Sequence, residues 1–455
     1  MHDPLAEARR FLQANPDVRS IDLVIYDLHG AARGKRIRAA DLTRIFADGM
    51  AFSGSVFGLD PTGHVIPDTG LGLEAGDPDS LCWPVPGSLT RIPWHARALG
   101  QVQLTMHERD GTPFFADPRQ VLARVLEGFR GRGLTPVVAV ELEFYLLDRA
   151  AARDVTTVRP PRSPHTGLRD YGHQVYAIED LEAFRPLLDD INAGAEALGL
   201  PLTTAVSESS PGQFEINLHH DDDAQRACDH AQLLKRLVKG AAVNHGLVAS
   251  FMAKPYPELS GSGMHVHASL VDAQGSNVFA GPERDPNDAL RHALGGCLRA
   301  LPACTALLAP NANSFRRLRP DTFAPTNLSW GYENRSAALR VPAGAPASRR
   351  IEHRVAGADA NPYLAMAVLL AGMLEGLQRG LDPGEPIQGN AATLGLASIP
   401  ASWHEALDRL LADPLPAAVL GERFVRLYHD CKQYERREFE KQVTPLEYAW
   451  YLHRA

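Results

Sequence analysis

Acidic residues and histidines interrupt two short apolar segments at a spacing of two. Glu141 and Glu143 lie in VVAVELEFYLL, and His265 and His267 lie in SGSGMHVHASL. Side chains two positions apart on a strand point to the same face. Two carboxylates on one apolar strand face repel each other and lose hydration, unless a cation lies beside them. The alternative is a sheet face on which both glutamates are solvated.

Three more carboxylates lie in segments that are ambiguous when read singly. Glu208 and Glu215 flank the Ser-Pro-Gly turn of SESSPGQFEINL, where a solvated hairpin explains them as well, and Glu352 lies in RRIEHR, which also suits a salt-bridged strand. Together the segments supply five carboxylates and one imidazole, a donor set that favours magnesium or manganese over zinc. Several carboxylates per metal allow two ions, which would bridge a polyphosphate. The predicted ligands are Glu141, Glu143, Glu208, Glu215, His265 and Glu352.

An arginine cluster follows the acidic segments. Eight arginines occur between positions 316 and 354, namely Arg316, Arg317, Arg319, Arg335, Arg340, Arg349, Arg350 and Arg354. Some must form a solvated face, but the planar guanidinium also binds carboxylate and phosphate through two parallel hydrogen bonds. Acidic metal ligands beside arginines suit phosphoryl transfer from ATP to a carboxylate. The segment GAARGKR at 30–36 is one residue short of a phosphate loop and predicts a surface turn, so ATP would be held by metal ions and arginines.

The elements that position these residues can be read from hydrophobic periodicity. Alternation predicts strands at 21–30, 101–108, 135–148 and 263–272. Helical periodicity predicts helices at 5–14, after the N-cap Asp117, and at 180–199, 222–246, 287–308, 361–380, 403–412 and 422–440. We therefore expect an α+β protein with a small β-rich N-terminal domain and a larger α+β domain.

Composition limits the class of protein. The chain has 455 residues, of which 45% are hydrophobic and 22% charged, and its formal net charge is −8, which indicates a globular chain and argues against a dedicated nucleic-acid binder. Five widely spaced cysteines without a C-x-x-C pair predict buried, reduced thiols in a cytoplasmic protein. No signal peptide or long apolar run is recognisable, so we expect no membrane partner.

Six motifs, in order along the chain, resemble those of the glutamine synthetase family. They are ELEFYLLD, PGQFEINL, KPYPELSGSGMHVHASL, NSFRRL, NRSAALRVP and RRIEHRVAGADANPYLA. The resemblance implies an N-terminal β-grasp domain at 16–112 and a catalytic domain at 113–455 with a curved antiparallel sheet flanked by helices. It implies ATP-dependent phosphorylation of the γ-carboxylate of glutamate, followed by displacement of phosphate by an amine. It also implies a homo-oligomer, usually a dodecamer of two stacked hexameric rings, with active sites between neighbouring subunits.

The resemblance also implies a role for individual residues. Glu143, Glu208 and Glu215 would hold one metal ion, and Glu141, His265 and Glu352 another, with two or three Mg²⁺ or Mn²⁺ ions in all. The expected ATP-binding residues are His267, Ser269, Arg335, Arg340 and Arg350. Gly261, Arg317 and Arg354 would bind glutamate, and Arg335 and Arg317 are the expected catalytic residues. Since all these positions are intact, a non-enzymatic homologue is disfavoured.

Two departures from the family bear on the acceptor. Ammonia-using members have an aspartate where this chain has Ser53, and a flap glutamate where it has Phe323. Losing two anions removes the site for a small cation, and an aromatic ring widens the pocket. We therefore expect Ser53 and Phe323 to form the pocket of a larger primary amine. The alternative is that other carboxylates have moved in to serve ammonia.

Among amine-using relatives the chain resembles γ-glutamylpolyamine synthetases, which would make putrescine or a related polyamine the acceptor. Ser260, before G-S-G-M-H, is another trait of amine-using forms. Isopropylamine, ethanolamine, methylamine and aniline remain alternatives, as does ammonia. Glu333 is a candidate base from sequence proximity alone, beside an expected flap at 315–330. Residues 389–400 contain no tyrosine, so adenylylation is not expected in this segment.

Overall fold

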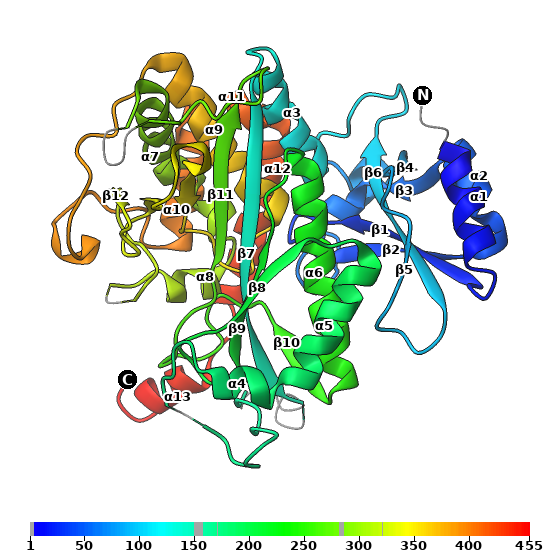
Figure 1. Ribbon diagram of the computed structural model, residues 1–455, viewed down its shortest axis with the longest axis horizontal. Helices are drawn as coiled ribbons and strands as arrows, with labels where there is room; N and C mark the ends of the chain where they lie inside the picture. The colour runs from blue at the N-terminus through cyan, green and yellow to red at the C-terminus, as the bar shows by residue number, and fades with distance from the viewer. Residues whose placement is uncertain (1–3, 150–157, 171, 282–285, 321) are drawn as a thin grey trace.

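Two β-sheets lie next to each other in the computed structural model, as Figure 1 shows, with the N-terminal sheet in blue and cyan on the right. The structure describes residues 4–149, 158–170, 172–281, 286–320 and 322–455. This mixed architecture has the curved sheet and flanking helices of the expected fold. The exact domain boundary between 112 and 113 stays a prediction.

The N-terminal sheet has six strands in the order β2-β1-β6-β4-β3, with β5 paired to β6. Its strands are β1 (Ser20–Tyr26), β2 (Ala32–Arg38), β3 (Met50–Ser53), β4 (Asp79–Pro84), β5 (Thr90–Arg91) and β6 (Leu99–His107). β1 runs parallel to β6, while the other pairs are antiparallel. The segment 30–36 was expected to form a surface turn. Most of it instead belongs to strand β2, and β2 pairs with β1 along the whole length of β1.

The central sheet has eight strands in the order β12-β13-β14-β11-β7-β9-β8, with β10 paired to β7. Its strands are β7 (Thr135–Asp148), β8 (Leu202–Ser207), β9 (Gln213–Leu218), β10 (Leu247–Ser250), β11 (Met264–Val271), β12 (Trp330–Tyr332), β13 (Leu339–Val341) and β14 (Ile351–His353). The sheet is not antiparallel throughout, because β12 and β13 are parallel. Along β7, Pro136 to Phe144 alternate in burial, which leaves Glu141 and Glu143 together on the less buried face.

Helices cover both sheets. They are α1 (Pro4–Ala14), α2 (Leu42–Asp48), α3 (Pro118–Arg130), α4 (Ile178–Ala183), α5 (Arg185–Leu198), α6 (Ala224–Asn244), α7 (Asp288–Leu308), α8 (Ala312–Arg317), α9 (Pro362–Arg379), α10 (Trp403–Ala412), α11 (Pro414–Leu420), α12 (Glu422–Glu440) and α13 (Pro445–Tyr451). The apolar α9 packs between α7, α3 and β11, and α6 packs on β7 and β10. The single helix expected at 180–199 is broken at Phe184, two positions before Pro186, because a proline cannot donate an interior helical hydrogen bond.

The N-terminal sheet is joined to the helical layer by polar contacts. His29 Nε2 lies 2.7 Å from the carboxylate of Glu435 on α12, and this glutamate also pairs with the buried Lys432 at 3.0 Å. The amide of Asn361, which caps α9, donates to the backbone oxygen of Asp27 at 3.0 Å. These contacts satisfy buried polar groups across the junction, so the two sheets are held in a defined relation.

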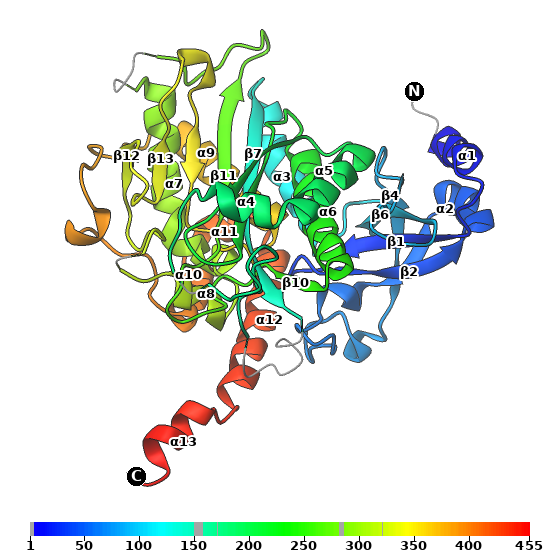
Figure 2. The ribbon, with the colours of Figure 1, turned by 60° about the horizontal axis from the view of Figure 1, so that its bottom comes forward.

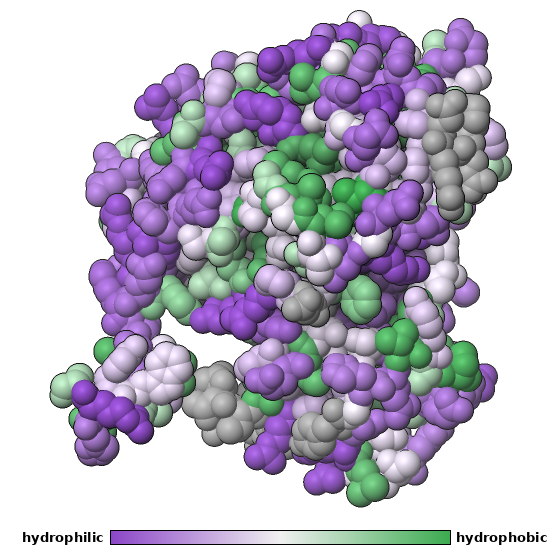
Figure 3. Space-filling view, turned by 90° about the vertical axis from the view of Figure 1, so that its left-hand side faces the viewer, coloured by the Kyte–Doolittle hydropathy of each residue, from purple (hydrophilic) through white to green (hydrophobic). Residues whose placement is uncertain are grey.

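The C-terminal helix stands away from the rest of the chain. Figure 2 shows α13 projecting beyond α12, and Figure 3 shows the same segment apart from the body at lower left, with apolar surface facing solvent. Its large side chains are more than half exposed, including Leu446, Tyr448, Trp450 and Tyr451. All five cysteines are free and buried, as expected. Within the described part of the chain, no helix is both long and apolar enough to cross a bilayer.

Candidate active site

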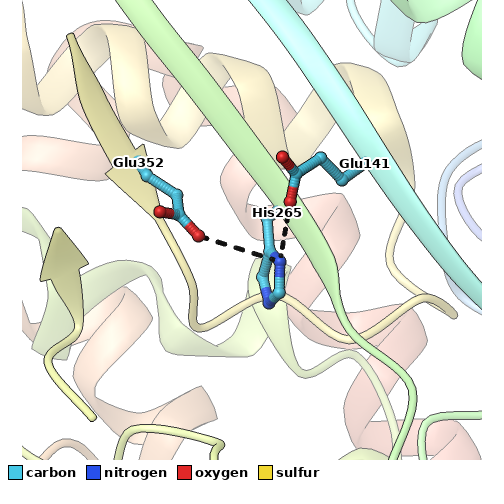
Figure 4. A group of neighbouring side chains, drawn as sticks. All are labelled: Glu141, His265 and Glu352. Carbon is cyan, nitrogen blue, oxygen red and sulfur yellow. Dashed lines mark hydrogen bonds and ion pairs between the residues drawn. The ribbon is translucent and has the colours of Figure 1, made fainter. Parts of the chain in front are cut away.

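The carboxylates and histidines singled out above converge on one face of the central sheet. Strand register brings them together, because Glu141 lies opposite His265 in the β7–β11 pair. Figure 4 shows Glu141 and Glu352 pointing at the His265 ring from either side. The ring Nδ1 lies 3.2 Å from Glu141 Oε2 and 3.9 Å from Glu352 Oε1. One donor atom from each of the three lies within 4.8 Å of the others, which is compact enough for one metal ion.

A second group shares the same histidine. Glu143 lies opposite Glu215 in the β7–β9 pair, and His265 Nε2 lies 3.9 Å from Glu143 Oε1. These three residues again place donor atoms within 4.8 Å of one another. Glu208 follows β8 and is close enough to raise the pKa values of both Glu143 and Glu215, but it is not a member of this compact group. The structure therefore places all six predicted ligands in one region, with His265 rather than Glu208 completing the second compact set.

The charges of this region are unbalanced without a cation. Burial, and then the neighbouring Glu208, raise the pKa of Glu143 to about 7. Burial and the surrounding carboxylates raise the pKa of Glu215 to about 9. Burial also lowers the pKa of His265 to about 4, so its ring is neutral and able to bind a metal at neutral pH. Carboxylate oxygens with one neutral imidazole suit a hard divalent cation, so the residues present fit a magnesium or manganese centre.

Glu141 and Glu352 have the opposite electrostatic environment. Burial opposes the charge of Glu141, but hydrogen bonds with His265 and His267 outweigh it and lower the pKa. Burial likewise opposes the charge of Glu352, and nearby cations, Arg354 foremost, lower its pKa to about 2. Glu141 and Glu352 are thus ionised before any metal binds. Glu143 and Glu215, by contrast, favour the protonated form, and a metal would displace their protons.

Arginines line the side of the cluster nearest β13 and β14. Arg340 Nη1 donates to Glu352 Oε2 at 2.7 Å, and these two residues are also cross-strand neighbours. Arg350 Nε donates to His267 Nδ1 at 3.2 Å. Ser269 continues the strand face of His265 and His267 and is half-buried. Of the expected ATP-binding set, Arg335 is the most exposed, which leaves its guanidinium available to a ligand.

The residues expected to bind glutamate also lie together. Arg317 is only 5% exposed, and its Nη1 donates to the backbone oxygen of Val355 at 2.8 Å. Its Nη2 donates to the backbone oxygen of Arg354 at 3.3 Å. A Cβ atom at Gly261 would lie 2.7 Å from Arg317 Cγ, so only glycine lets this segment approach the arginine. The Arg354 guanidinium bonds to Glu352, which connects this pocket with the acidic cluster.

A model of the glutamine synthetase catalytic domain matches residues 115–451. The chain belongs to the glutamine synthetase family.

Curated relatives of this glutamine synthetase family member use different amines by name. The gamma-glutamylputrescine synthetase PuuA of Escherichia coli is 44% identical over 450 residues, covering 99% of this chain and 95% of that protein. The gamma-glutamylethanolamide synthetase GlnA4 of Streptomyces coelicolor is 33% identical, covering 96% and 93%. A solved structure titled GmaS/ADP complex superposes with a TM-score of 0.85 at 28% identity, covering 99% of this chain and 100% of that one.

The proposed amine pocket is not assembled within one chain. Ser53 lies at the end of β3 in the N-terminal sheet, whereas Phe323 follows α8 and is 75% exposed. Figure 1 shows β3 in the N-terminal sheet and α8 beside the central sheet, in separate parts of the molecule. Ser260 lies nearer the cluster, where its hydroxyl is 2.6 Å from that of Ser209, next to Glu208. A pocket made of Ser53 and Phe323 would therefore need two chains of this glutamine synthetase homologue.

Two features of this site were missed from the sequence. Asp77 lies 24 positions from Ser53, yet its carboxylate accepts a hydrogen bond from the Ser53 hydroxyl. Its only sequence signal is a Gly-Asp-Pro turn, and the backbone φ of 47° at Asp77 brings the chain back to β3. Asp359 was also missed: its Oδ2 accepts from Asn311 and Ser314 at 2.8 Å each, which anchors the start of the helix that carries Arg317.

Glu333 is a poor candidate for the base that deprotonates the amine. Its carboxylate accepts hydrogen bonds from Arg340 at 3.1 and 3.2 Å and from the backbone nitrogen of Ala343. Burial opposes its charge, but these contacts lower its pKa. A carboxylate with a lowered pKa accepts a proton less readily, so Glu333 acts here as a partner of Arg340.

Proposed function

We propose that this protein is an ATP-dependent ligase that joins the γ-carboxylate of L-glutamate to a primary amine through γ-glutamyl phosphate, with putrescine or a related polyamine as the amine. The observation that carries the proposal is the contact of the Glu141–His265–Glu352 group with Arg340 and Arg354 on one sheet face. The choice of polyamine is supported by the 44% identity to PuuA over nearly the whole chain.

The metal-binding residues would be Glu141, Glu143, Glu208, Glu215, His265 and Glu352, and Mg²⁺ is the ion we propose. A divalent ion bound there supplies charge neutralisation for the phosphates of ATP. His265 serves both groups from its two ring nitrogens, since one faces Glu141 and Glu352 and the other faces Glu143. The carboxylates on both sides fix the orientation of the His265 ring. Both metal-binding groups therefore depend on this one side chain.

The arginines would act on the substrates directly. Arg340 and Arg350, held by Glu352 and His267, present guanidinium groups where the ATP phosphates would lie, and the exposed Arg335 would stabilise the transferring phosphoryl group. Arg317 and Arg354 would hold glutamate with its γ-carboxylate toward the acidic cluster. The segment around 315–330 would exclude water from the acyl phosphate, and the base for the amine is unassigned.

The amine would enter where a second chain brings Ser53 and Asp77 to the Phe323 segment. The Asp77 carboxylate restores a negative charge beside the serine that replaces the family aspartate. This charge would attract the ammonium form of an amine, and the exposed ring of Phe323 would contact its methylene groups or cation. The same carboxylate is the specific observation that keeps ammonia as the second candidate acceptor.

Replacing Asp77 with asparagine tests this arrangement. We expect KM for the amine to rise about tenfold or more, since a charge-assisted hydrogen bond is lost. The KM values for ATP and glutamate should stay unchanged. Asp48→Asn, at an exposed position on α2 of the same sheet region, is the matched control. Unaltered amine kinetics in Asp77→Asn would remove Asp77 from the pocket.

A screen of acceptors decides the reaction itself. Purified protein with ATP, Mg²⁺ and glutamate should release phosphate fastest with putrescine or spermidine, and mass spectrometry should detect the γ-glutamyl amide. Ammonium, isopropylamine, ethanolamine, methylamine and aniline form the comparison set. A preference for ammonium would move the assignment to glutamine synthetase activity, and no phosphate release with any acceptor would contradict the ligase proposal.

We further propose a homo-oligomer, with a dodecamer of two hexameric rings as the family expectation, in the cytoplasm. The assembly is supported by the exposed apolar side chains of α13, because patches of this kind usually mark contact surfaces. The localisation is supported by five free, buried cysteines.

Deleting residues 443–455 should weaken this assembly. The segment removes Val443, Leu446, Tyr448, Trp450 and Leu452, which lie outside the body of the chain and are more than half exposed. We expect sedimentation velocity to show species smaller than those of the full chain, while circular dichroism shows an unchanged fold. A truncated protein with the full oligomeric mass would show that α13 is not a major contact.

A further inference from the structure

A pocket of about 280 Å³ lies between the N-terminal sheet and helix α6, away from the acidic cluster. One wall consists of β1, β6 and the segment 85–90, and the other consists of α6 with the end of α5. Its volume is close to the lower limit of ordinary small-molecule pockets, about 300 Å³. None of the residues assigned above to metal, ATP, glutamate or amine lines it.

Two glutamines on the same face of β6 enter this pocket and differ in their bonding. The Gln103 amide nitrogen donates to Asp229 Oδ1 and to the Tyr363 hydroxyl at 2.8 Å each. Gln101, two positions earlier, is only 3% exposed, and within the described part of the chain neither its amide nitrogen nor its amide oxygen has a hydrogen-bond partner. Buried amides are nearly always bonded, so Gln101, a residue of the pocket lining, holds an unused donor and an unused acceptor.

The pocket also contains one positive charge without a carboxylate partner. Arg119 is paired with Asp229 at 3.0 Å, and Arg226 is paired with Asp221 at 2.6 Å. Arg236 on α6 lies 5.9 Å from the centre of the Trp94 ring and faces the Tyr26 hydroxyl, and among the described residues it forms no ion pair. Asp223, which also lines the pocket, accepts hydrogen bonds from the backbone nitrogens of Gln225 and Arg226 as the N-cap of α6. Arg236 is therefore the guanidinium of the lining that can pair with the carboxylate of a ligand.

We propose that this pocket binds a small carboxylate that also carries an amide group. The carboxylate would pair with the planar guanidinium of Arg236. The amide N–H of the ligand would donate to the Gln101 oxygen, and its C=O would accept from the Gln101 nitrogen. A plain carboxylate could not form both bonds, because it has no hydrogen-bond donor. This site is independent of the proposed ligase reaction, since it shares no residue with it.

Such a ligand would bridge the two parts of the chain. Gln101 belongs to the N-terminal sheet, and Arg236 belongs to the helix that packs on β7 and β10 of the central sheet. A molecule bonded to both resists their separation, and ligands that bind only the folded state stabilise it. Hydrogen exchange should therefore slow in residues 99–107 and in residues 224–236 together.

N-acetylglycine is the probe, because it joins a carboxylate and an amide in one small molecule. Isothermal titration calorimetry on the full chain should show saturable binding, with Gln101→Leu and Arg236→Met each weakening it about tenfold or more. Lys239→Met, one turn further along α6 at an exposed position outside the pocket, should bind as the wild type does. Acetate and acetamide, which carry one group each, should each bind at least about tenfold more weakly.

Several outcomes would overturn the site. Equal binding by wild type, Gln101→Leu and Arg236→Met would place the probe elsewhere, and loss of binding in Glu143→Gln would place it in the acidic cluster. Absence of saturable binding to the wild type would remove the site altogether. If a pocket variant fails to fold, exchange in the wild type decides, because protection must occur in both 99–107 and 224–236.

Discussion

Replacing Glu143 with glutamine will abolish ligation with every amine and at the same time stabilise the metal-free protein. Activity should fall about 10³-fold or more, because the side chain keeps its shape but loses the charge that we propose holds a divalent ion. The variant should also bind Mg²⁺ more weakly, as measured by calorimetry. Retained activity with any amine would exclude Glu143 from the metal site.

The stabilisation follows from the sign of the pKa shift. Burial, and then Glu208, raise the pKa of Glu143 to about 7, above the usual value of a glutamate. As the pH rises from about 4.5 toward 7, the unfolded chain loses this proton before the folded chain does, so the wild-type fold loses stability. The variant Glu143→Gln should therefore exceed the wild type in free energy of unfolding over this pH range, by at most about 3 kcal/mol. Below this pH range the difference should vanish.

Glu141→Gln is the matched comparison. This carboxylate is on the same strand face, but hydrogen bonds with His265 and His267 lower its pKa despite burial. Its neutralisation should therefore destabilise the metal-free protein while also abolishing activity. Thermal melting with chelator present should show a higher Tm than the wild type for Glu143→Gln and a lower Tm for Glu141→Gln. If both variants shift Tm equally and in the same direction, the electrostatic assignment is wrong.

Replacing Arg317 with methionine will lower kcat/KM for glutamate by about 10²- to 10³-fold and leave the KM for ATP nearly unchanged. A buried guanidinium lost from a carboxylate costs about 2–5 kcal/mol of binding. Arg317 is held by the backbone oxygens of Val355 and Arg354, with Gly261 packed against its methylene chain. These contacts fix the guanidinium in one orientation, in which we propose that it holds a substrate carboxylate.

Arg316→Met is a close control, since Arg316 is the preceding residue on α8. Its guanidinium is exposed and lies 5.8 Å from the centre of the Phe439 ring, outside the pocket. Its loss should change glutamate kinetics by less than about twofold. If both variants lose glutamate affinity equally, then the effect comes from α8 as a whole, and Arg317 has no special contact with substrate.

Most secondary elements could be predicted from periodicity, because the buried faces of strands and helices impose it. The strand at 135–148 and the helices at 287–308 and 403–412 occur within one residue of their expected bounds. The helix expected at 180–199 is two helices, since periodicity does not register the local effect of Pro186. The parallel β12–β13 pair could not be read from strands of only three residues each.

The carboxylate and histidine positions were determined by the sequence itself. Their spacing of two on β7 and β11 places each pair on one strand face, and the motif order identifies the family that shares them. Strand register then does the rest, because Glu141 faces His265 and Glu143 faces Glu215 across neighbouring strands. Local rules were sufficient here because a sheet converts sequence spacing into spatial spacing.

Only the tertiary structure decided the features that depend on contacts between distant segments. It places the Asp77 carboxylate, from a turn 24 residues away, on the Ser53 hydroxyl, a contact that the sequence did not predict. It puts β3, which ends at Ser53, and α8, which precedes Phe323, in separate parts of the molecule. Among the described residues, it also gives the Gln101 amide no hydrogen-bond partner, although the Gln103 amide nitrogen on the same strand face has two. Loop paths and junctions between packed sheets have no fixed period, so residue spacing carries no information about which groups meet there.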